Sequence, residues 1–176
     1  MKPRFLPSLL ALAVAVVLAA ETAPPAAALP EVPYPDGFRR WAHVASAILS
    51  AKMGEAANHA GEEKAAAPHG LIHNLYANEL ALEGYRTGHF PEGAVLIADW
   101  FILEETRAGL KQGPRKSVDV MIRDARYTET GGWGFENFER DSHTQRNVGP
   151  KAVASCFECH RHAGPEREFV FSTLRP

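Results

Sequence analysis

The chain has few cysteines: Cys156 and Cys159 are the two among its 176 residues. Two cysteines three positions apart cannot form the disulfide framework of a small secreted domain, and they cannot supply a site of four thiolates. The apolar share of 45% is enough for a packed core without such cross-links. The length and composition therefore predict one globular domain, and the two cysteines need another explanation.

The chain also lacks a large excess of charge of either sign. Its formal net charge is -2. Binding to a nucleic-acid backbone depends on a strongly basic surface, so this class of partner is excluded. No internal repeat at a fixed period is visible.

A convincing membrane-spanning run is missing as well, because spanning takes about 20 consecutive apolar residues. The apolar run at residues 5–20 follows Lys2 and Arg4 and is followed by small residues. This is the pattern of an export signal. We expect residues 1–28 to be a signal peptide and leader, cleaved after Ala20 or Ala28, and the domain to span residues 34–176. An uncleaved anchor is the alternative. Export predicts a periplasmic or otherwise extracytoplasmic location.

The periodicity of the domain predicts more strands than helices. Residues 71–76, 94–103, 118–122 and 133–138 are typical of strands, the last of them half-buried. Asn78 and Gly88 would cap a short helix at residues 79–87. Residues 42–57 fit either a helix or a strand, and residues 140–155 resemble a loop. We therefore expect a mainly β (α+β) fold, an antiparallel sheet with a few short helices.

The motif that carries chemistry is Cys-x-x-Cys-His at residues 156–160. This is the pattern of covalent c-type haem attachment. Two thiols about one turn apart can each bond one vinyl group of the porphyrin, while the imidazole of His160 reaches the iron as axial ligand. The motif thus predicts one haem c, bound by two thioethers near the C-terminus.

Three alternatives compete with haem attachment. The motif could be a redox-active cysteine pair, a zinc site completed by His160 and His162, or a coincidence. A redox pair is expected at the start of a helix in a parallel βαβ unit, which does not precede Cys156. A zinc site would need a fourth ligand. A sixth haem ligand could come from one of the other histidines, or from Met53 or Met121, although core filling is the usual role of buried methionine.

The chain resembles the cytochrome P-460 family, which includes the cytochromes c′-beta. The resemblance covers most of residues 34–172, through YPDGFRRW, HGLIHNLYAN, YRTGHFPEG, VMIRDARYTETGGWGFENF, CFECH and FVFS. It implies a mainly antiparallel β fold, a homodimer, and a five-coordinate haem with an open distal side. Small diatomic ligands such as nitric oxide and carbon monoxide are the implied partners. A redox partner protein is a further candidate partner.

Hydroxylamine-oxidising members of that family join a lysine to the haem edge. Matching residues 90–93 to the family's turn places that lysine position at Ala98, and residues 94–103 contain no lysine. On a strand, Ala98 shares a face with Leu96, Trp100 and Ile102. We therefore expect an apolar distal wall and a ligand-binding cytochrome. A hydroxylamine or nitric oxide oxidoreductase of the cytochrome P-460 type, or a six-coordinate electron-transfer cytochrome, is the alternative.

Two further residues are candidates for contact with the haem. Phe90 is a possible counterpart of the phenylalanine that crowds the distal site in the cytochromes c′-beta, or else a core aromatic that anchors its turn. Arg123 interrupts an apolar run and could support a bound ligand or pair with a propionate. The alternative for Arg123 is a surface ion pair with Asp124 or Glu129.

Overall fold

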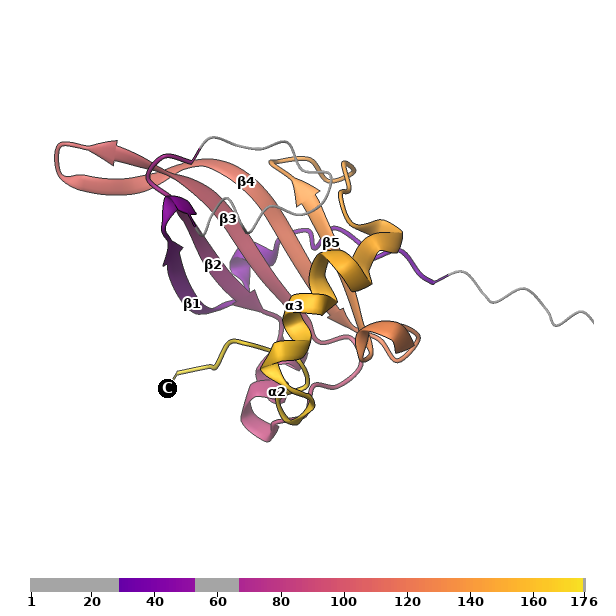
Figure 1. The fold of residues 1–176 in the computed structure, drawn as a ribbon. Coiled ribbons are helices and arrows are strands. Elements are labelled where there is room, and N and C mark those ends of the chain that lie inside the picture. The colour runs from indigo at the N-terminus through magenta and orange to yellow at the C-terminus, as the bar shows by residue number, and fades with distance from the viewer. Residues whose placement is uncertain (1–28, 53–66, 176) are drawn as a thin grey trace, which may run out of the picture.

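The computed structural model describes residues 29–52 and 67–175. Within them, one antiparallel sheet contains five strands in the order of the chain (Figure 1). The strands are β1 (Ala42–Leu49), β2 (Leu71–Ala77), β3 (Val95–Thr106), β4 (Gly109–Arg123) and β5 (Trp133–Glu139). Each strand pairs with the next one along the chain. The predicted mainly β fold is confirmed.

The helices are short. Helix α2 (Glu79–Thr87) begins after Asn78, whose side chain accepts a hydrogen bond from the Ala81 amide, and it ends at Gly88, which has a φ of 79°. This matches the prediction from its two capping residues. Helix α3 (Glu158–His160) lies in a longer run of helical turns near the C-terminus, with a π-helical turn at Val153–Phe157 before it and a 3₁₀ turn at Arg161–Ala163 after it.

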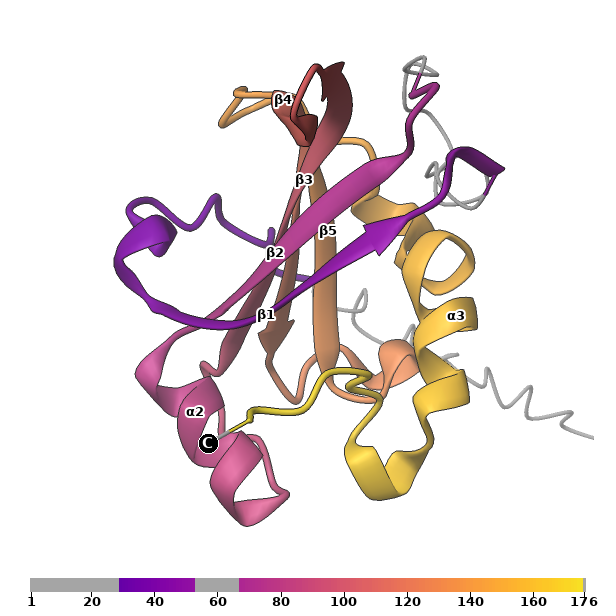
Figure 2. The same ribbon diagram turned by 90° about the vertical axis from the view of Figure 1, so that its left-hand side faces the viewer.

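The two faces of the sheet are covered by different parts of the chain (Figure 2). We call the face that carries Met121 and Phe135 the motif face, because these residues pack in one hydrophobic cluster with Cys156. The opposite, outer face carries Ile97, Val118 and Phe138, which form a second cluster with Val32 and Phe38 of the N-terminal segment. None of the helices within the described residues is long and apolar enough to cross a membrane.

Two predicted elements differ from the structure. Residues 140–155 were expected to form a loop, but helical turns begin at Gly149–Lys151, where Pro150 occupies the first turn. Proline is favoured there because it lacks the N–H group that a first turn leaves without a partner. Strand β5 is buried on both faces rather than half-buried, because the N-terminal segment covers one face and the helical turns cover the other.

The ambiguous segment at residues 42–57 forms strand β1 at its start. Residues 53–57 lie outside the described residues.

Candidate functional site

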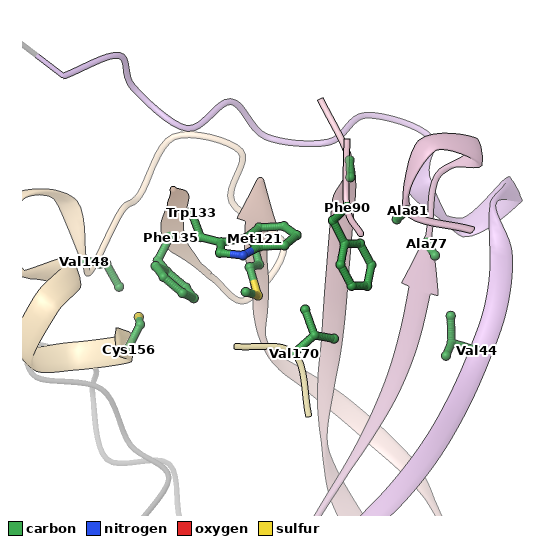
Figure 3. Packing of buried hydrophobic residues seen from close by; sticks show 11 residues of the cluster. Val44, Ala77, Ala81, Phe90, Met121, Trp133, Phe135, Val148, Cys156 and Val170 are labelled. Atoms are coloured by element: carbon green, nitrogen blue, oxygen red, sulfur yellow. The ribbon is translucent and has the colours of Figure 1, made fainter. Parts of the chain in front are cut away.

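The cysteine motif lies on a run of helical turns at residues 149–163, which we call the motif segment. This segment crosses the β4 and β5 half of the motif face (Figure 1). Cys156 is buried, 8% exposed, whereas Cys159 is exposed. Figure 3 shows Cys156 beside Val148 and Phe135, at one end of the cluster that continues toward Met121 and Phe90. The segment therefore places one thiol in the core and the other at the surface.

His160 has a fixed orientation. Its Nδ1 donates a hydrogen bond to the Phe169 carbonyl oxygen at 3.0 Å. Its ring centroid lies 5.0 Å from that of Phe135 and 5.3 Å from that of Phe171. A hydrogen bond at Nδ1 sets the tautomer and makes Nε2 the nitrogen that a metal takes. His160 thus has the surroundings expected of a metal-ligating histidine.

The zinc alternative receives no support from this geometry. Among residues 29–52 and 67–175, no three side chains of the His, Cys, Asp and Glu types gather closely enough to hold a metal ion. The Nδ1 of His162 lies 3.1 Å from the Cys159 carbonyl oxygen, so this imidazole is engaged by the backbone of its own turn.

Ala98 lies on the motif face, as the alternation of strand β3 predicts. Its neighbours across the sheet are Leu75 on β2 and Asp119 on β4. Leu75 and Leu96 pack against the cluster that contains Cys156. Leu75, Leu96 and Ala98 are each partly exposed, so an apolar part of the motif face is left incompletely covered by the described protein.

The prediction that this face is wholly apolar is wrong. Asp119 lies on it, and its carboxylate accepts hydrogen bonds from Trp100 Nε1 at 2.9 Å, Ser117 Oγ at 3.1 Å and Asn137 Nδ2 at 2.6 Å. Asn137 is fully buried. The periodicity of β3 could not reveal these groups, because they belong to the neighbouring strands and reach Ala98 only through the register of the sheet.

His73 adds a second polar group to the motif face. It pairs with Trp100 across the β2–β3 ladder, and the two ring centroids are 4.2 Å apart. Burial lowers the pKa of His73 below its ordinary value, and the nearby charge of Asp119 partly opposes that shift. Its Nδ1 is buried without a hydrogen-bond partner among the described residues. A neutral imidazole with an unsatisfied nitrogen is therefore present on the face that the motif segment covers in part.

Phe90 and Arg123 lie in the same region but have structural partners. Phe90 is buried in the cluster, with its ring edge-on to Tyr85 and Trp133 at centroid distances of 5.2 and 5.5 Å. Arg123 donates to the Gly131 carbonyl oxygen at 2.6 Å and lies over the Trp133 ring. Neither expected ion pair of Arg123 is seen, since Asp124 pairs with Arg126 instead.

Sequence reasoning missed two groups of this site, Asp119 and the Phe169 carbonyl. It included His73 only as one of the histidines that could supply a sixth haem ligand. The sequence signals for His73 are its place in a strand-like run and its spacing of four residues from His69, and neither separates it clearly from the other histidines. The carbonyl of Phe169 could not be found from residue types, because a backbone acceptor carries no sequence signature.

The arrangement fits a haem c. It offers two thiols one turn apart, an imidazole oriented through Nδ1, and partly exposed apolar side chains on the facing sheet. Cys156 and Cys159 would hold the porphyrin covalently, and His160 would ligate its iron. The haem would supply a redox-active iron able to take a further ligand.

Comparison with known proteins agrees with this fit. A family model for cytochrome P460 matches residues 35–172, which include all five strands and the cysteine motif. No curated protein matches the chain. Because the matched region covers most of the sequence, the chain belongs to the cytochrome P460 family.

Proposed function

We propose that this protein is an exported mono-haem c-type cytochrome that binds small diatomic ligands, nitric oxide and carbon monoxide among them. Cys156 and Cys159 would attach the haem and His160 would be its axial ligand. Membership of the cytochrome P460 family supports a haem cytochrome. The hydrogen bond from His160 to the Phe169 carbonyl supports the assignment of the axial ligand.

The observation that carries the choice of function is Ala98. This residue occupies the position that the family resemblance gives to the cross-linking lysine, and its cross-strand neighbours are Leu75 and Asp119. A methyl group cannot form a bond from an amine to the porphyrin. The haem would therefore keep the electronic properties of an ordinary haem c, which favours ligand binding over hydroxylamine oxidation.

A five-coordinate iron is part of the same proposal. Met121 pairs with Leu96 and Phe135 across the sheet and is 6% exposed within the cluster. Such surroundings favour a core-filling role over iron ligation. An open sixth position is what a gaseous ligand requires.

The second candidate is oxidative turnover of a small protic substrate. Asp119 and His73 favour it, because a carboxylate and a neutral imidazole on the motif face could exchange protons with a substrate within hydrogen-bond reach. A redox partner protein would then be needed to remove the electrons.

The absorption spectrum of the reduced protein separates these candidates. We expect a high-spin ferrous haem that binds carbon monoxide and nitric oxide, and no steady oxidation of hydroxylamine with an artificial electron acceptor. A low-spin spectrum in both oxidation states would indicate an electron-transfer cytochrome. Sustained hydroxylamine oxidation would favour the enzyme.

A further inference from the structure

A strained turn lies beside the hydrogen bond of His160. Glu168 and Phe169 have φ angles of 47° and 64°. Residues other than glycine rarely adopt this left-handed conformation, because the Cβ atom then crowds the backbone. Two such residues in succession persist only where their surroundings hold them in place.

The side chain of Glu168 supplies much of that hold. One carboxylate oxygen accepts a hydrogen bond from His89 Nδ1 at 2.5 Å, and the other accepts from the Phe90 amide at 2.8 Å. The backbone carbonyl of Glu168 accepts from Trp133 Nε1 at 2.9 Å. The carboxylate is largely shielded, with its side chain 17% exposed. Glu168 thus ties the C-terminal turn to the loop before β3 and to the start of β5.

The next peptide carries the acceptor for His160. Phe169 directly follows Glu168, and its carbonyl oxygen is the acceptor for His160 Nδ1. The backbone N–H of Phe169 donates to the Gly164 carbonyl oxygen at 3.0 Å. The Phe169 ring packs on Phe157 of the motif segment, with the centroids 5.0 Å apart. A change in the backbone at residue 168 would therefore rotate the carbonyl that His160 Nδ1 uses.

We propose that Glu168 is a positioning residue for the axial ligand. Its carboxylate, held by His89 and the Phe90 amide, keeps the Phe169 carbonyl in line with His160 Nδ1. Hydrogen bonding at Nδ1 raises the electron donation of a ligating imidazole. This inference rests on the proposed function, because it requires His160 to ligate the haem iron.

The test compares Glu168→Ala with Glu166→Ala in the haem-loaded protein. Glu166 is exposed in the same turn, so its replacement removes the same charge without removing the anchor. We expect Glu168→Ala to lower the iron–histidine stretching frequency in the resonance Raman spectrum and to make the reduction potential more positive. Glu166→Ala should leave both quantities near the wild-type values. Glu168→Gln keeps an oxygen for the Phe90 amide, so both quantities should also stay close to the wild-type values in this variant.

Glu168→Gly covers the case in which Glu168→Ala does not fold. Glycine accepts the left-handed conformation without strain, so the backbone remains feasible while the carboxylate is lost. The same two shifts are expected. If haem-loaded Glu168→Ala or, where that variant does not fold, Glu168→Gly matches Glu166→Ala in both measurements, the positioning role is overturned and the proposed function stands. If the wild-type protein carries no haem on His160, both are overturned.

Discussion

The protonation of His73 is coupled to folding. Its pKa lies below the ordinary value of 6.5, chiefly because the ring is buried. The unfolded chain therefore binds this proton more readily than the folded protein does. It follows that protonation of His73 favours the unfolded state: this loss of stability is absent above about pH 6.5 and develops as the pH falls through the lowered pKa.

Replacement of His73 by phenylalanine tests this coupling. The variant keeps a ring against Trp100 but removes the imidazole that titrates. It also removes the buried Nδ1 atom, and a buried polar atom without a hydrogen-bond partner costs about 1–3 kcal/mol of stability. We expect its urea midpoint to fall less than that of the wild type between pH 7 and pH 5. His43→Phe is the control, since His43 is exposed on β1. Equal pH dependence in wild type and His73→Phe would contradict the account.

At the scale of elements, the turn before β5 depends on a close approach between backbone and ring. Gly131 ends the short helix Thr128–Thr130 with a φ of 64°, and a Cβ atom there would lie 2.3 Å from the Phe169 ring. Gly88 has a similar φ of 79°, but no described atom lies within 4 Å of its would-be Cβ. An alanine at either position would therefore adopt an unfavourable left-handed conformation. Only at Gly131 would its Cβ atom also clash with a neighbouring side chain.

We expect Gly131→Ala to destabilise the protein more than Gly88→Ala does. The left-handed conformation costs alanine about 1 kcal/mol at either position, and overpacking adds about 1–3 kcal/mol at Gly131. The free energy of unfolding in urea gives the comparison. Equal losses in the two variants would mean that the Phe169 ring moves aside freely.

Elements defined by local signals were predicted well, and those defined by distant partners were not. Helix α2 was predicted at both ends because Asn78 and Gly88 carry its caps. Of β4, only residues 118–122 were predicted. The first half of β4 is largely exposed and pairs with the end of β3 outside the hydrophobic clusters. Because neither of its faces is buried, its sequence lacks the alternation of apolar and polar residues that predicts a strand. The polar side of the site was missed because the β3–β4 register alone brings Asp119 next to Ala98.

At the scale of the whole molecule, we propose that two copies associate, as the family resemblance implies. Strand β1 is at the edge of the sheet, and Ile48 on it is 64% exposed. An edge strand with an exposed apolar residue is a common site of association. Light scattering should give a dimer, and a monomer at all protein concentrations would contradict the proposal.

We propose that one haem is bound covalently through Cys156 and Cys159. Three observations support this attachment: the two thiols of the motif, the orientation of His160 by its hydrogen bond, and membership of the cytochrome P460 family. Attachment of the haem to a lysine is the competing chemistry to exclude, and Lys116 of β4 is a buried lysine, 8% exposed. A third bond to the porphyrin from a lysine would favour the hydroxylamine-oxidising reading that Ala98 argues against.

Peptide mapping by mass spectrometry locates the bonds to the haem, on protein produced together with a haem-attachment system. We expect one haem on the peptide that contains residues 156–160, bound by two thioethers, with the peptide that contains Lys116 unmodified. Cys159→Ala should leave a single thioether at Cys156. An unmodified cysteine peptide, or a haem that also carries a bond to a lysine, would contradict the account.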